Sequence, residues 1–164
     1  MRTRLALTAL LLLGGCVYTF NPSNIPGHIK TLEVPVVENQ TLEVELSDQL
    51  TTALTERFVE DNTLRVVQTD ADAFLECVVT GYENRVFGFN QDQVANEYVV
   101  ILAVNLTLRD RVKSKEIWSE EQVRGQATYF LDGSGEGVTT EDEARTLAIK
   151  QIVDFAISKT VEGW

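Results

Sequence analysis

Basic residues gather in one short stretch of an otherwise acidic chain. Although the formal net charge is −11, four of the seven residues from 109 to 115 are basic, namely Arg109, Arg111, Lys113 and Lys115. Such a cluster can bind the phosphate groups of a ligand, and a hairpin tip would let it reach into a confined space. The alternative is a solvated turn that keeps a sheet edge soluble. Asp110 and Glu116 favour this alternative because they partly neutralise the stretch.

Residues that could support catalysis or bind a metal are sparse. His28 is the only histidine, and no partner clusters near it in the sequence, so we expect a linker histidine. Cys77 alternates with Leu75 and Val79, which predicts a small buried side chain rather than a reactive thiol. The sequence therefore predicts no enzymatic activity and no metal site.

Two further segments resemble ligand-binding motifs only superficially. The glycine-rich segment 133–137 lacks the lysine of a phosphate-binding loop and the acidic spacing of an EF-hand. Asp70 and Asp72 are paired carboxylates at a turn, where an Asx turn is the expected role. We expect no bound cofactor.

The first sixteen residues carry the pattern of a covalent modification. Arg2 and Arg4 precede an almost wholly apolar run over residues 5–13, which is typical of a secretory signal and too short to span a bilayer. The run ends in Leu13-Gly14-Gly15-Cys16, which resembles the lipobox of bacterial lipoproteins. This resemblance implies that residues 1–15 are removed and that Cys16 is acylated. The alternative is an ordinary signal peptide with a chance cysteine.

Composition is consistent with one acidic domain on a short tether. Removal of 15 of the 164 residues leaves 149, and loss of two arginines changes the net charge from −11 to −13. A body this acidic is a poor generic partner for nucleic acid. Residues 16–28 form the lipidated N-terminus and a short linker, whose twelve residues 17–28 reach at most about 40 Å, so the domain at 29–164 must stay close to the membrane. If Cys16 is acylated, Cys77 has no partner for a disulfide within the chain.

Hydrophobic periodicity predicts four strands and two helices. The expected strands cover residues 29–38, 74–87, 97–110 and 116–130, and the expected helices cover 42–60 and 139–161. Pro35 predicts an edge strand or a bulge, and Thr140 with Glu143 predicts a capping box. The order β-α-β-β-β-α predicts an α+β fold with both helices on one face of a four-stranded sheet. The other face of the last strand would carry Trp118, Gln122, Arg124, Gln126 and Thr128.

Several short motifs occur along the chain in a characteristic order. After the lipobox come Tyr18, His28-Ile29-Lys30, Val34-Pro35-Val36-Val37-Glu38-Asn39-Gln40-Thr41, Leu64-Arg65-Val66-Val67, Asp70-Ala71-Asp72-Ala73, Gly81-Tyr82, Leu108-Arg109-Asp110 and Trp118. In this order and spacing they resemble the LptE family of lipopolysaccharide-assembly lipoproteins. The resemblance implies two helices on a four-stranded sheet. It also implies a plug inside a large outer-membrane β-barrel, LptD, and binding of lipopolysaccharide.

These observations together predict a lipid-anchored protein on the periplasmic side of the outer membrane. Val17 favours the outer membrane, because an aspartate after the acylated cysteine usually retains a lipoprotein in the inner membrane. The expected partners are an LptD-like barrel, lipopolysaccharide and the membrane, with no nucleic acid. The alternative is a lipoprotein that activates a cell-wall synthase or serves another envelope assembly machine, although the short linker argues against reaching the cell wall.

Overall fold

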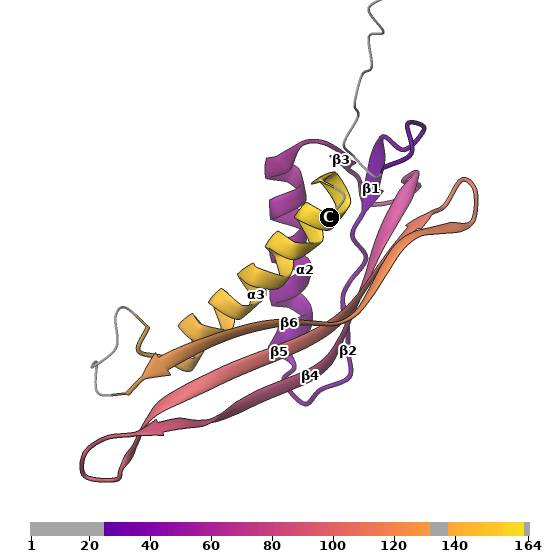
Figure 1. The fold of residues 1–164 in the computed structure, drawn as a ribbon. Helices are drawn as coiled ribbons and strands as arrows, with labels where there is room; N and C mark the ends of the chain where they lie inside the picture. The colour runs from indigo at the N-terminus through magenta and orange to yellow at the C-terminus, as the bar shows by residue number, and fades with distance from the viewer. Residues whose placement is uncertain (1–24, 132–137, 163–164) are drawn as a thin grey trace, which may run out of the picture.

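A computed structural model describes residues 25–131 and 138–162 (Figure 1). Within these residues nine elements follow one another. They are β1 (Thr31–Glu33), β2 (Glu38–Asn39), α2 (Glu45–Asp61), β3 (Arg65–Val66), β4 (Ala73–Phe89), β5 (Ala95–Asp110), β6 (Lys115–Phe130), α3 (Glu141–Ile157) and the π-helical turn η2 (Ser158–Glu162). The segment 133–137 and Cys16 lie outside the described residues.

The sheet is mixed and has six strands rather than the predicted four. Its order is β3-β1-β4-β5-β6, with β2 also paired to β4. Strands β4, β5 and β6 form a long antiparallel meander, whereas β1 and β2 run parallel to β4 and β3 runs parallel to β1. The predicted order of one strand, one helix, three strands and one helix is therefore correct for the long elements and incomplete for the short ones.

The predicted strand over residues 29–38 is divided because its middle turns towards a helix. Pro35 has no N–H for a sheet ladder. The N–H of Val37 donates to Thr51 Oγ1 of α2 at 2.9 Å, and Ser47 Oγ donates to the Val37 carbonyl at 2.6 Å. These bonds satisfy the backbone of Val37 away from β4, so pairing with β4 stops after β1 and resumes at β2.

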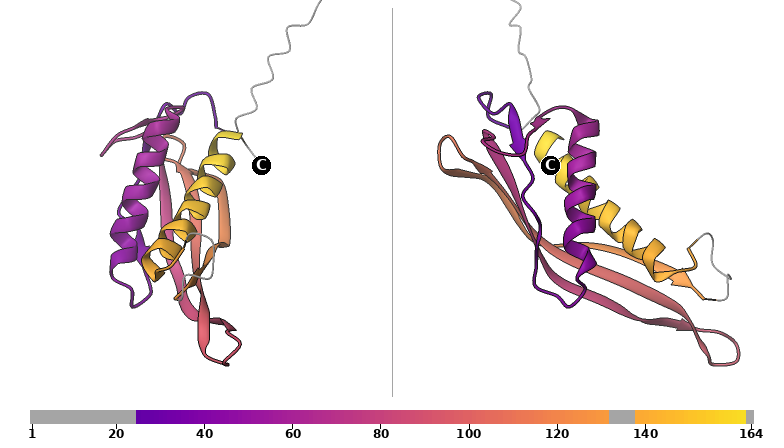
Figure 2. Two further views of the ribbon diagram at one scale, coloured as in Figure 1. Left: turned by 90° about the vertical axis from the view of Figure 1, so that its left-hand side faces the viewer. Right: turned by 180° about the vertical axis from the view of Figure 1, so that it is seen from behind.

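Both helices cover one face of the sheet, as the sequence predicts (Figures 1 and 2). Along β5, Val100, Leu102, Val104, Leu106 and Leu108 have no exposed surface. They pack against buried stripes on the helices, namely Leu46, Leu50, Leu54 and Phe58 of α2 and Ala144, Ala148, Ile152 and Ala156 of α3. This alternation of buried and outward residues along β5 is what a sheet covered on one face requires.

Two β-bulges reverse which residues face the helices. The β4–β5 register shifts between Val79 and Gly81, and the β5–β6 register shifts opposite Val104 and Leu106. In β6 the bulge contains Gln122, which has a φ of 56°. A bulge adds one residue to one strand and so changes the side-chain phase after it.

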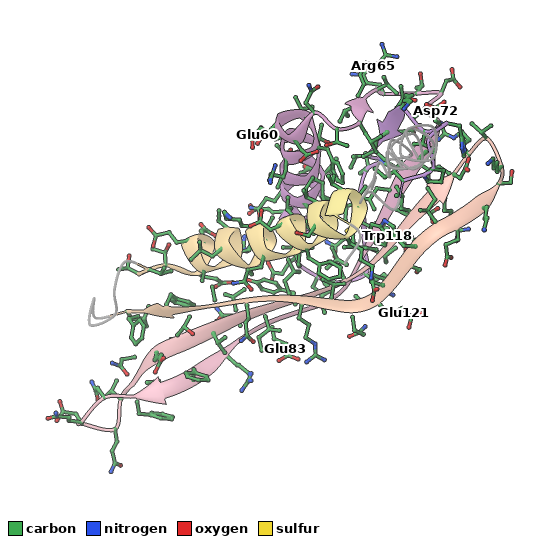
Figure 3. The ribbon with its side chains drawn as sticks, turned by 45° about the horizontal axis from the view of Figure 1, so that its top comes forward. Glu60, Arg65, Asp72, Glu83, Trp118 and Glu121 are labelled. Atoms are coloured by element: carbon green, nitrogen blue, oxygen red, sulfur yellow. The ribbon has the colours of Figure 1, made fainter. Side chains whose placement is uncertain are left out.

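The bulge in β6 overturns the predicted exposure of Trp118. Trp118 precedes the bulge, is paired with the buried Leu108, and is only 8% exposed. Figure 3 shows Trp118 on the helix side of the sheet, whereas Glu83 and Glu121 lie on the opposite side. A single alternating phase along the whole strand, as the sequence predicts, is therefore wrong.

Helix α3 packs unusually closely on the edge strand β6. A Cβ added at Gly125 would collide with the backbone of Ala148, so this position requires a glycine. Gln151 pairs with the strand backbone, accepting from Gln126 N at 3.0 Å and donating to Gln126 O at 2.8 Å. The predicted capping box of Thr140 and Glu143 is confirmed at the start of α3.

Candidate functional site

The basic cluster lies at the tip of the β5–β6 hairpin, as expected. We call Arg109, Arg111, Lys113 and Lys115 the basic turn. Strand β5 ends at Asp110 and β6 begins at Lys115, and Ser114 adopts a φ of 50° in the connection between them. The hairpin tip lies at the same end of the molecule as β1 and β3 (Figure 1).

The two arginines of the basic turn are held by carboxylates of the fold. Arg109 Nε lies 2.8 Å from Glu76 Oε2, and Arg111 Nη2 lies 2.7 Å from Glu33 Oε2. The guanidinium of Arg111 also stacks over the Phe74 ring, 5.0 Å from its centroid. The arginines therefore fasten the hairpin to β1 and β4, and much of their charge is already compensated.

The two lysines of the basic turn remain available to a ligand. Lys113 and Lys115 are exposed, and within the part of the chain that the structure describes neither ammonium group forms an ion pair. Val112 lies beside Lys113 and is 65% exposed. The capacity of the turn to bind an anionic group thus rests mainly on these two lysines.

The buried carboxylate of Asp110 binds both the backbone of the basic turn and the N-terminal segment. Asp110 is 3% exposed, accepts a hydrogen bond from Lys113 N at 2.9 Å, and lies 2.7 Å from His28 Nε2. Burial by itself raises the pKa of Asp110, but the hydrogen bonds from Lys113 N–H and His28 outweigh burial and leave this pKa below its usual value. His28 is therefore more than a linker histidine, because it connects the N-terminal segment to the basic turn.

Asp72 does not form the Asx turn that the sequence predicts. Its Oδ2 instead accepts hydrogen bonds from Lys30 N at 2.8 Å, Thr31 N at 3.0 Å and Thr31 Oγ1 at 2.9 Å. The bond from the Lys30 backbone, followed by those from Thr31, lowers the pKa of Asp72. Asp72, which is labelled in Figure 3, thus ties the segment before β4 to β1.

A second polar cluster joins the N-terminal ends of both helices to β4. The guanidinium of the buried Arg145 lies 3.3 Å from carboxylate oxygens of Glu45, Glu141 and Asp142. Tyr82 donates to Glu141 Oε1 at 2.6 Å, and this bond is the main cause of the lowered pKa of Glu141. Arg145 appears in the sequence as an ordinary helix-surface residue, so nothing in the periodicity indicates this cluster.

The sheet face away from the helices is polar along β6. Arg124, Gln126 and Thr128 pair with Ala103, Ile101 and Val99, which alternate with the helix-facing residues of β5. Gln122 joins them through the bulge, since its N–H donates to Asn105 Oδ1 at 3.0 Å. These groups can form hydrogen bonds with a wall placed against this face.

The same face contains a hollow of about 540 Å³ beside β4. Its lining includes Val36, Phe74, Glu76, Asn105 and Arg111. Cys77 lies in this region but is 5% exposed, and burial raises the pKa of its thiol to about 12. The predicted burial of Cys77 is confirmed, and the neutral thiol has little nucleophilic character.

Metal ligands do not assemble anywhere in residues 25–131 and 138–162, where no group of three or more His, Cys, Asp or Glu side chains could hold an ion. Within the same residues, no helix is long and apolar enough to cross a membrane.

Comparison with known proteins agrees with this arrangement. The family model LptE, described as lipopolysaccharide-assembly, matches residues 29–159, which is nearly the whole folded domain. The chain belongs to the LptE family. It is therefore a lipoprotein of the lipopolysaccharide-assembly type. A comparison with curated proteins found no match.

Solved structures share the fold at low sequence identity. Protein XCC0632 from Xanthomonas campestris is 13% identical with a TM-score of 0.58, covering 81% of this chain and 84% of that chain. A minor lipoprotein from Acinetobacter baumannii is 15% identical with a TM-score of 0.52, covering 82% and 92%. Lipoprotein B from Nitrosomonas europaea is 18% identical with a TM-score of 0.50, covering 82% and 86%. The LptE-family fold is thus shared with several bacterial lipoproteins.

Proposed function

We propose that this LptE-family protein is anchored in the outer membrane by acylated Cys16 and plugs an LptD-like β-barrel that delivers lipopolysaccharide to the cell surface. The observation that carries this proposal is the family match over residues 29–159, because it spans the domain from β1 to the end of α3. The protein acts by binding and not as an enzyme. Its membrane contact comes from the lipid on the periplasmic side.

The polar face of the sheet supports the plug function. A plug inside a barrel must present hydrogen-bonding groups to the polar wall of the lumen. Gln122, Arg124, Gln126 and Thr128 offer such groups on one rigid surface, while the helices bury the apolar face. Because the sheet is bonded along its length, these side chains are held in a fixed arrangement.

The basic turn supports direct binding of lipopolysaccharide. Lipid A carries phosphate groups, which bind ammonium and guanidinium groups through charge-assisted hydrogen bonds. Lys113 and Lys115 would make these contacts, and Arg109 and Arg111 would support them from their ion pairs with Glu76 and Glu33. The hairpin itself needs no rearrangement, since both arginines already hold it against the fold.

Extraction of the tagged full-length protein from its own cells in mild detergent tests the proposed partner. Mass spectrometry should recover a large β-barrel protein in about equal amount. A matched extraction of a different outer-membrane lipoprotein controls for abundant porins. Recovery of a peptidoglycan synthase in place of the barrel would instead support the alternative function, activation of cell-wall synthesis, and recovery of the protein alone would contradict the plug.

A further inference from the structure

We propose that the end of the domain bearing the basic turn rests on the membrane surface, where Lys113 and Lys115 bind anionic phospholipid headgroups and Val112 enters the headgroup layer. This placement rests on the acylation of Cys16 proposed above. The phosphate chemistry is the same as in the lipid A contacts proposed above, and the ligand assigned here is phospholipid of the leaflet that holds the anchor, which the two lysines contact when no lipopolysaccharide is bound. The opposite end, at the β4–β5 turn, then points away from that leaflet.

The N-terminal segment and the basic turn lie side by side. The described chain begins at Ile25, at the end of the domain that carries the β5–β6 tip (Figures 1 and 2). Pro26 lines one hollow together with Lys113 and Lys115, and His28 Nε2 lies 2.7 Å from Asp110 Oδ2. Pro26 and His28 are therefore held against the turn.

The length of the tether limits how far this end can move from the membrane. Ile25 is nine residues after Cys16, and nine extended residues span at most about 32 Å. The buried side chains of Ile25 and Ile29 hold the start of the described chain against the core. A lipid on Cys16 thus keeps the basic turn, and not the β4–β5 turn, near the bilayer.

Charge is distributed unevenly between this end and the rest of the domain. The end comprises residues 25–33, 56–76, 107–119 and 158–162, which include β1, the end of α2, β3, the start of β4, the β5–β6 tip and η2 (Figure 1). It contains eight basic and ten acidic residues, whereas the rest of the chain after residue 24 contains four basic and fifteen acidic residues. A molecule with this distribution approaches an anionic surface with the less acidic end first.

Ion pairing leaves positive charge on the outside of this end. Glu33 and Glu76 are paired with Arg111 and Arg109, and Asp110 is buried beneath the turn. Lys113 and Lys115 are exposed and have no such partners among the described residues, and they follow the exposed Val112 in the same turn. Basic side chains around an apolar tip are suited to the boundary between headgroups and acyl chains.

Site-specific fluorescence on the acylated full-length protein tests this orientation. A solvent-sensitive dye is attached to Val112→Cys and, as a matched probe at the opposite end, to Val94→Cys, whose native side chain is 58% exposed. Cys77 is buried and should not react with the dye. The protein is reconstituted into vesicles of phosphatidylcholine alone, phosphatidylcholine with phosphatidylglycerol, or phosphatidylcholine with lipopolysaccharide.

We expect the dye at position 112 to shift to a less polar environment in phosphatidylglycerol vesicles, while the dye at position 94 does not. Adding Lys113→Glu and Lys115→Glu should abolish the shift, whereas the control pair Arg85→Glu and Lys150→Glu, at exposed positions and with the same change in net charge, should keep it. Circular dichroism verifies that each variant is folded.

Three results would overturn the inference. Equal signals from positions 112 and 94 would show that the turn does not face the membrane. An equal shift in vesicles of phosphatidylcholine alone would exclude recognition of anionic headgroups. A shift only with lipopolysaccharide would exclude the phospholipid ligand and leave the proposed function intact. Conversely, if the extraction experiment recovers no barrel but the shift with phosphatidylglycerol is present, only the proposed function is contradicted.

Discussion

The buried carboxylate of Asp110 connects parts of the chain that are distant in sequence. It joins His28, 82 residues away, to the turn formed by the β5–β6 hairpin. Arg145 similarly reaches Glu45, 100 residues away. Burial of Cys77 and the Thr140 capping box could be predicted because they depend on near neighbours in the sequence. The long-range pairs could not, because no local period determines which charged groups the fold brings together.

The hydrogen bonds that Asp72 accepts predict, at the residue scale, that the stability of the folded protein depends on pH. Because they lower its pKa below 3.8, this carboxylate stabilises the folded protein above the unfolded-state pKa of 3.8. The stabilisation is lost as the pH falls through the lower pKa of the folded state. We expect Asp72→Asn to lower the urea midpoint at pH 7. The variant should also lose less stability than the wild type when the pH is lowered from 7 to below 3.8.

Urea unfolding at pH 7 and at a pH below 3.8 checks this prediction. Asp92→Asn, in the exposed β4–β5 turn, is the matched control and should leave the urea midpoint nearly unchanged at both pH values. An unchanged pH dependence in Asp72→Asn would show that the bonds to Lys30 and Thr31 contribute nothing to stability.

The strands and helices follow from the period of their apolar residues, but their irregularities do not. The six apolar residues that alternate along β5 from Tyr98 to Leu108 predict this strand correctly, and the apolar stripe of α2 predicts this helix correctly. A bulge changes the phase by one residue, so the sequence around Gln122 looks like uninterrupted strand and leads to the wrong exposure for Trp118. The division of β1 from β2 depends on Thr51 and Ser47, which lie on another element.

The contact between β6 and α3 gives a prediction at the element scale. Gly125→Ala places a methyl group against the Ala148 backbone and must displace the helix. We expect a loss of about 1–3 kcal/mol in the free energy of unfolding.

Chemical denaturation measures this loss, with Gly81→Ala as the control. A Cβ at Gly81 would lie 3.7 Å from the Cβ of Ala103, an ordinary contact, so the control should lose much less stability. Equal stability of the two variants would mean that the sheet and α3 can separate without cost at this point.

Across the whole molecule, the fold separates three surfaces. The helices bury the apolar face of the sheet, the other face presents polar groups, and the end at which the described chain begins carries the basic turn. The family and the helix-on-sheet architecture could be predicted from motifs and periodicity. The ion pairs that hold Arg109 and Arg111 could not be predicted. Because of these pairs, the candidate contacts to an anionic ligand are reduced from four residues to the two lysines.

Charge reversal of these lysines tests their contribution to lipopolysaccharide binding. We expect Lys113→Glu with Lys115→Glu to weaken binding of the purified full-length protein by at least about tenfold, because two charge-assisted contacts become repulsive. Pull-down with labelled lipopolysaccharide measures the change, and Arg85→Glu with Lys150→Glu is the control for net charge. Equal binding by both double variants would show that the basic turn is only a solvated turn.

Depletion of the protein from its own cells is the most direct test of the central claim, lipopolysaccharide assembly at the cell surface. We predict that lipopolysaccharide in the outer leaflet falls before peptidoglycan composition changes, and that the wild-type chain restores it. Normal surface lipopolysaccharide together with altered peptidoglycan would contradict the claim and would favour a cell-wall function for this LptE-family fold.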